Sequence, residues 1–132
     1  MVMVQNGCTT LLEFTALLKA VRSAMKWEQL SEQSCAIARF LGVLGDRWSL
    51  LIITDCFLGA QRFETFKSRL DISRTMLSER LKKLCDYGIL EKVEYQQKPS
   101  RYCYQLTAKG LDLHPVMMTM TAWSNRHQPD KG

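Results

Sequence analysis

The sequence has few of the residues that build metal and catalytic sites. It contains two histidines, His114 and His127, and five cysteines with no C-x-x-C pair among them. Structural zinc sites depend on closely spaced Cys and His ligands, so no metal site is expected. No Ser/His/Asp set and no carboxylate pair stands out either. The sequence therefore predicts a protein that is not an enzyme and that needs no cofactor.

Long apolar runs are missing as well, and none approaches the length of a membrane-spanning helix. The most apolar N-terminal stretch, Leu11–Val21, contains Glu13 and Lys19, and no small-residue cleavage site follows it. The five cysteines, at positions 8, 35, 56, 85 and 103, are odd in number. We expect free thiols in a reducing cytoplasm and no membrane partner.

Proline is scarce, with three residues in 132, whereas 46% of the chain is apolar. A chain of this length and composition can bury a core, so disorder is not expected. The formal net charge is +5, and the stretch from Arg62 to Arg101 holds ten basic and six acidic residues. Most of the positive surplus therefore lies in the middle of the chain, where it would attract a polyanion.

Apolar residues at helical spacing predict three helices before residue 60. The first follows a capping-box pair, Thr10 and Glu13, and extends to about Met25. The second is expected between Ser34 as its N-cap and Gly45, and the third between Asp46 as its N-cap and Gly59. The residues expected to be buried in the third helix are Trp48, Leu51, Ile52 and Cys56, with Leu50 and Ile53 as further candidates.

Two short helices separated by a tight turn come next. Phe63, Phe66 and Leu70 mark the first, and the turn is expected at Asp71-Ile72. Ser73 is a good N-cap for the second helix, which is predicted to reach Tyr87 and end at Gly88. This arrangement is typical of a helix-turn-helix.

Alternating residues then predict a β-hairpin. Its strands are expected over 89–95 and 102–106, with a polar loop over 96–101, and Cys103 is expected on an accessible face. Thr107 is the predicted N-cap of one last helix, whose apolar residues exceed what a monomer needs. The predicted fold is mainly α with a small β-hairpin wing (α+β), a winged helix-turn-helix.

The helix after Ser73 has the pattern of a recognition helix. Leu77, Leu81 and Leu84 form its buried face, and short polar side chains lie opposite them. Glu79 has two interpretations, acceptance of a hydrogen bond from cytosine N4 or repulsion of misplaced phosphates. The predicted base-contacting residues are Arg74, Thr75 and Ser78, and the predicted phosphate-contacting or supporting residues are Arg62, Ser73, Lys82, Lys83, Lys98 and Arg101.

Two other interpretations stay open. A charged outer face is ordinary for a solvated amphipathic helix, and a polar hairpin loop can be polar because it is exposed. The chain could also be a winged-helix module that binds another protein and no DNA, since fold alone does not decide function. The basic outer face around Arg74 favours double-stranded DNA as the partner.

Several linked motifs resemble those of the HxlR-type winged helix-turn-helix regulators. They are Cys35-Ala-Ile-Ala-Arg-Phe-Leu, Leu44-Gly-Asp-Arg-Trp-Ser-Leu-Leu-Ile, Arg62-Phe, Ile72-Ser-Arg-Thr-Met-Leu-Ser-Glu-Arg-Leu, Tyr87-Gly-Ile-Leu and Tyr102-Cys-Tyr-Gln-Leu-Thr-Ala-Lys-Gly. The resemblance implies a bacterial or archaeal transcription regulator that binds a palindromic operator as a homodimer. It also implies three parts: an extension with an amphipathic helix (1–34), the winged domain (35–106), and a dimerisation helix with its tail (107–132).

The resemblance further implies a sensing role for Cys35, because some family members detect oxidants or electrophiles at this position. A cysteine at a helix N-terminus, with Arg39 one turn further on, has surroundings that favour the thiolate. The alternative is a small buried residue that packs a dimer interface. Ala36 departs from the proline common in the family, and the 34 residues before Cys35 are more than is usual. Redox or small-molecule regulation is thus an expectation that stays open.

Overall fold

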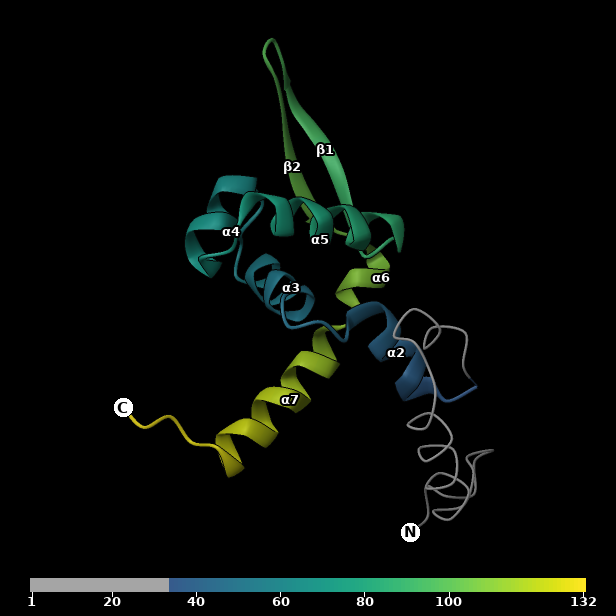
Figure 1. Ribbon diagram of the computed structural model, residues 1–132, viewed down its shortest axis with the longest axis vertical. Helices are drawn as coiled ribbons and strands as arrows, with labels where there is room; N and C mark the ends of the chain where they lie inside the picture. Colours follow the sequence, from purple (N-terminus) through teal and green to yellow (C-terminus); the bar gives the residue numbers. More distant parts are fainter. Residues whose placement is uncertain (1–33) are drawn as a thin grey trace. The chain divides into compact units, whose positions relative to one another are not determined.

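The computed structural model describes residues 34–132 (Figure 1). The described residues fall into two units, 34–46 and 47–132. The predicted helix after Thr10 and the residue Cys8 lie outside the described residues. Within the part that the structure describes, no helix is long and apolar enough to cross a membrane.

In the first unit, helix α2 (Ala36–Leu44) begins one residue later than predicted. Its N-cap is Cys35 and not Ser34, because Cys35 has the extended backbone that precedes a first helical turn (φ −71°, ψ 119°). The Ser34 carbonyl instead accepts a hydrogen bond from Arg39 Nη1 at 2.6 Å. The predicted end at Gly45 is confirmed.

In the second unit, helix α3 (Ser49–Phe57) corrects two predictions. Its N-cap is Trp48, whose side chain makes no capping bond, and not Asp46. Leu51 is 46% exposed, whereas Ile53 is fully buried together with Ile52. The predicted burial of Ile52 is confirmed and that of Leu51 is wrong, because four consecutive large apolar residues, 50–53, leave the buried side of the helix undefined in the sequence. The chain turns at Gly59, whose φ of +94° favours glycine.

Helices α4 (Phe63–Leu70) and α5 (Arg74–Asp86) form the predicted helix-turn-helix. Asp71 has a left-handed backbone (φ 49°, ψ 46°), which reverses the chain between them. The Ser73 side chain accepts the backbone N–H of Met76 at 3.2 Å, so this predicted N-cap is confirmed. The second unit packs its core around this pair, with the fully buried side chains Ile52, Ile53, Phe66, Leu77, Leu81 and Leu84.

The wing is an antiparallel hairpin of β1 (Leu90–Gln97) and β2 (Ser100–Leu106). Its strands extend into the predicted loop and leave a connection of two residues, Lys98 and Pro99. A β-bulge at Tyr95, between Glu94 and Gln96, interrupts the register. The expectation that Cys103 is accessible is wrong: it pairs with Val93 on the covered face and is 6% exposed.

The last predicted helix is in fact two, α6 (Ala108–Leu111) and α7 (His114–His127). Thr107 caps the first by accepting the backbone N–H of Gly110 at 3.1 Å. Pro115 lies in the first turn of α7, where its missing N–H costs nothing. Helix α7 contains no buried residue, and it leads away from the helix pair and the wing (Figure 1).

Candidate nucleic-acid interface

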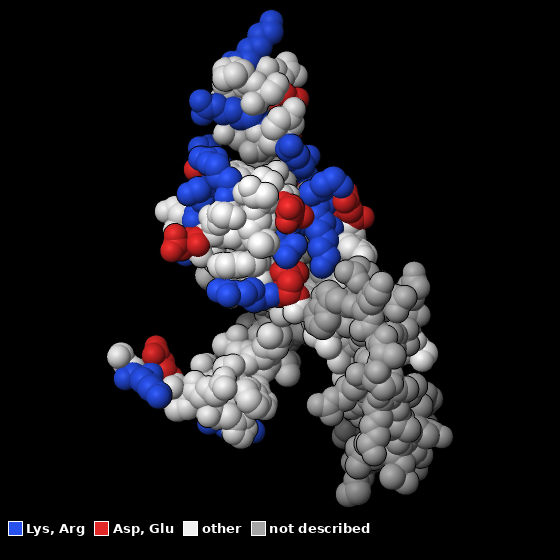
Figure 2. Space-filling view, in the orientation of Figure 1, with Lys and Arg blue, Asp and Glu red and all other residues white. Residues whose placement is uncertain are grey.

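The outer surface of helix α5 is polar and exposed along its whole length. Leu77, Leu81 and Leu84 are buried beneath it, as predicted. Figure 2 shows Lys and Arg side chains gathered over the helix pair and the wing, with fewer acidic side chains among them. Nine of the ten predicted DNA-contacting residues are exposed, and Lys83 is half-buried. The exposed ones are Arg62, Ser73, Arg74, Thr75, Ser78, Glu79, Lys82, Lys98 and Arg101.

The start of α5 carries an organised arginine. Arg74 Nη2 lies 2.7 Å from Glu64 Oε1, and the Arg74 guanidinium carbon lies 5.6 Å from the centre of the Phe63 ring. Glu64 and Phe63 belong to the first turn of α4, so the turn at Asp71 brings the beginnings of the two helices together. The side chain predicted to contact bases is thus oriented by the neighbouring helix.

Further along α5 the predicted phosphate contact has an acidic neighbour. Lys82 Nζ lies 2.6 Å from Asp86 Oδ2, one turn on. This hydrogen bond and the carboxylate charge raise the pKa of Lys82. A phosphate bound at Lys82 either shares the ammonium with Asp86 or displaces the Asp86 carboxylate from it.

The wing is attached to the helices beside Arg62. The Arg62 guanidinium carbon lies 5.0 Å from the centre of the Tyr95 ring, and the Tyr104 backbone N–H donates to the Gln61 carbonyl at 2.7 Å. The bulge turns Tyr95 out of the alternation of β1 and toward this arginine. Lys92 Nζ, also on β1, lies 4.4 Å from the centre of the Tyr102 ring on β2. Lys98 and Arg101 are exposed at the hairpin tip.

The sequence analysis missed Glu64, Phe63 and Tyr95 as members of this surface. An acid in a first helical turn suggests only a favourable helix dipole, and an aromatic residue in a strand suggests only packing. Their pairing with Arg74 and Arg62 depends on the backbone geometry of the predicted turn at Asp71 and on the bulge, and the bulge has no specific sequence pattern here.

The described cysteines are poorly accessible or weakly acidic. Cys35 and Cys103 are buried. Burial, aided by the charge of Asp55, raises the pKa of Cys56 to about 12. The pKa of Cys85 is also raised, mainly by burial and partly by Asp86, with Lys92 opposing. In residues 34–132 no three His, Cys, Asp or Glu side chains gather in a way that could hold a metal ion.

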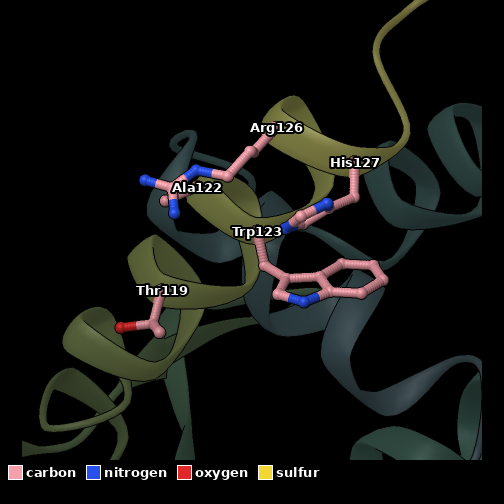
Figure 3. A pocket seen from close by; sticks show the side chains of 5 residues that line it. All are labelled: Thr119, Ala122, Trp123, Arg126 and His127. Atoms are coloured by element: carbon pink, nitrogen blue, oxygen red, sulfur yellow. The ribbon is translucent and has the colours of Figure 1, made fainter.

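Helix α7 offers apolar surface away from the basic one. Val116, Met120 and Trp123 are exposed at spacings of four and three residues, which places them on one face. The Trp123 ring also lies 5.1 Å from the His127 ring, at an interplanar angle of 45°. Thr119, Ala122 and Arg126 complete a shallow depression around these two rings (Figure 3). A groove of about 290 Å³ separates α7 from α3. It is lined by Leu50, Leu51, Thr54, Met117, Met120, Thr121, Ser124 and Asn125.

Comparison with known proteins agrees with this architecture. An HTH-type transcriptional regulator of Mycobacterium tuberculosis, Rv3095, is 35% identical over 94 residues, which are 71% of this chain and 60% of that protein. This chain therefore spans less than two thirds of the length of that relative. The solved structure of PA1607, a candidate transcription factor, has a TM-score of 0.71 with 33% identity, over 81% of this chain and 75% of the other.

A second solved structure is the reduced form of the Bacillus subtilis transcriptional regulator YodB. It has a TM-score of 0.63 and 33% identity, over 75% of this chain and all of YodB. YodB has also been solved after diamide treatment and with bound quinone. Residues 43–131 of this chain match the HxlR-like helix-turn-helix family, whose relatives are transcriptional regulators and not enzymes. The chain belongs to the HxlR-like helix-turn-helix family.

Proposed function

We propose that the chain binds double-stranded DNA sequence-specifically as a homodimer, with one α5 helix in the major groove of each half of a palindromic operator. The observation that carries the proposal is the exposed face of α5 at Arg74, Thr75 and Ser78, which continues into the basic wing. Short polar side chains let a helix approach base edges, and arginine donates two hydrogen bonds to guanine. Lys98 and Arg101 extend the contact to the adjacent minor groove or its phosphates.

Salt dependence of DNA binding tests this proposal. Operator affinity measured by fluorescence anisotropy should fall steeply with KCl, by roughly 0.9 units of log–log slope for each phosphate contact. The probe is a duplex enriched by the wild-type protein from a randomised pool. Arg74→Ala should weaken binding to this duplex by at least about fivefold. When single base pairs of the duplex are changed, the variant should lose its discrimination mainly at one of them. Lys131→Ala removes one positive charge in the exposed tail, and it should change affinity little at any base pair.

A flat salt response, or no enriched duplex at low salt, contradicts DNA binding. If Arg74→Ala binds every operator sequence more weakly by the same factor, Arg74 contacts a phosphate and not a base. In that case base recognition would fall to the remaining residues of the first two turns, Thr75, Ser78 and Glu79.

The proposed dimer uses the apolar face of α7. Val116, Met120 and Trp123 are 36%, 46% and 57% exposed. Monomeric proteins rarely expose so many large apolar side chains together on one helix face. Trp123→Glu should produce a monomer in sedimentation velocity and lose operator affinity. Met118 is 54% exposed but lies about 200° around the helix from Val116, so Met118→Glu is the matched control. A monomeric wild type, or equal effects of the two variants, contradicts this interface.

Thiol regulation is the proposed effector response, with Cys35 as the reacting group. It is supported by the position of Cys35 at the start of α2 and by the diamide-treated and quinone-bound forms of YodB. Because Cys35 is only 6% exposed, its reaction requires local opening around the residue. Diamide should change operator affinity of the wild type and of Cys85→Ser, but not of Cys35→Ser. If diamide changes the operator affinity of Cys35→Ser as much as that of the wild type, this cysteine is removed from the mechanism.

A further inference from the structure

The ion pair between Glu64 and Arg74 contributes little to the fold. The side chains are 67% and 64% exposed, and exposed pairs of this kind stabilise proteins only weakly. What the pair does determine is the direction of the Arg74 side chain, at the first residue of the helix proposed to enter the major groove. A free arginine has many rotamers, whereas this one is held between a carboxylate and the Phe63 ring.

The contact leaves Arg74 able to bind DNA. A guanidinium has five N–H donors, and the contact to Glu64 involves one terminal nitrogen, Nη2. Donors on Nη1 and Nε stay available for a second acceptor, such as the O6 or N7 atom of guanine. An arginine already held in position loses less conformational freedom when it binds.

The carboxylate also changes which part of DNA Arg74 favours. A phosphate carries a full negative charge and is repelled by Glu64, whereas a guanine edge is neutral and polar. Glu64 therefore penalises the sequence-independent contact more than the base contact. Repulsion of the wrong partner is a common source of specificity.

We infer that Glu64 is a positioning residue of the DNA interface, which orients Arg74 toward a base edge and suppresses its binding to phosphate. This inference rests on the proposed function of α5. It assigns to an acidic side chain of α4 a role in specificity that lowers total affinity for DNA.

The test compares affinities for two duplexes, the one enriched from a randomised pool and one of mixed sequence, over a KCl series. Glu64→Gln should bind the mixed duplex several-fold more tightly, with a salt slope steeper by roughly one unit, and should lose at least about fivefold in the ratio of the two affinities. Glu64→Asp keeps the charge on a shorter side chain, so it should keep weak mixed-sequence binding but lose part of the ratio. Asp112→Asn removes an exposed acid at the end of α6 and should leave the ratio unchanged.

The double variant Glu64→Gln/Arg74→Ala isolates the pair. In the Arg74→Ala background, Glu64→Gln should no longer alter the affinity ratio. A wild-type ratio in Glu64→Gln, or a change that persists without Arg74, overturns the inference while DNA binding stands. If the wild type enriches no duplex at all, the proposed function falls and this inference with it. Thermal unfolding of each variant checks that all of them are folded.

Discussion

Gly110 provides the sharpest test of how the wing is joined to the C-terminal helices. It is buried in α6, and a Cβ built there would lie 2.3 Å from the Ile89 carbonyl oxygen and 3.0 Å from Leu106 Cδ2. The same oxygen accepts hydrogen bonds from the Thr107 backbone N–H at 3.1 Å and its hydroxyl at 3.2 Å. Gly110→Ala therefore forces α6 away from the residue that precedes β1 and weakens both bonds.

Three effects set the magnitude of this change. Overpacking of a tight site costs about 1–3 kcal/mol. A weakened hydrogen bond adds about 1 kcal/mol, and the better helix propensity of alanine returns about 1 kcal/mol. We expect the free energy of unfolding to fall by about 2 kcal/mol and the Tm by roughly 6–12 °C. Thermal and urea unfolding followed by circular dichroism measure both quantities.

Gly88→Ala is the matched control. Gly88 has a φ of +72°, but its nearest foreign atom to an added Cβ is Lys109 Cδ at 4.0 Å, so only backbone strain applies. That strain costs about 1 kcal/mol. If Gly110→Ala is as stable as the wild type, or loses less stability than Gly88→Ala, the close approach of α6 to Ile89 is refuted.

Four further predictions concern Tyr95, Ser73 and Cys56. Tyr95→Ala removes the ring beside Arg62 and should weaken operator binding several-fold, with less than about 1 kcal/mol lost in the free energy of unfolding. Tyr95→Phe keeps the ring and should keep both the operator affinity and the stability of the wild type. Equal losses of operator affinity in the two variants, measured by fluorescence anisotropy, contradict this prediction. Ser73→Ala should cost about 1 kcal/mol in urea unfolding, and no loss would mean that the cap is unimportant. At pH 8 the thiolate fraction of Cys56 is about 1000-fold below that of an ordinary thiol, so its alkylation, followed by mass spectrometry, should be at least about 30-fold slower than in the unfolded chain. Because its folded pKa is raised, this thiol stabilises the fold fully below about pH 9 and loses that contribution as the pH rises toward 12; a rising stability over that range contradicts the sign.

The helix-turn-helix and its wing could be predicted because several independent signals agree there. The Ser73 cap, the leucines of α5 and the end near Gly88 each define the same helix, and the structure moves its boundaries by one residue at most. Helix α3 has no such agreement. With an apolar residue at every position from Leu50 to Ile53, periodicity cannot indicate which side faces the core, and only packing against α4 and β2 decides it.

The organisation of the site was predictable in part. Composition and spacing identify Arg74 and Arg62 as basic residues beside a recognition helix. Their partners come from a left-handed residue, Asp71, and from the bulge at Tyr95, both of which are set by three-dimensional packing. Likewise Cys103 obeys the predicted alternation, but alternation alone does not say which face of a two-stranded wing is covered.

The far end of α5 is also in contact with a neighbouring element. Lys109 Nζ donates to the Tyr87 carbonyl at 2.6 Å, and the Thr107 hydroxyl bonds to the Gly88 carbonyl, so residues of α6 close the end of the recognition helix. Through Glu64 at its start and Lys109 at its end, α5 contacts the elements that precede and follow it in the winged unit. A movement of α5 alone would break contacts at both of its ends. A movement of the whole winged unit would keep them, and the DNA would then accommodate a misfit by its own twist and bend.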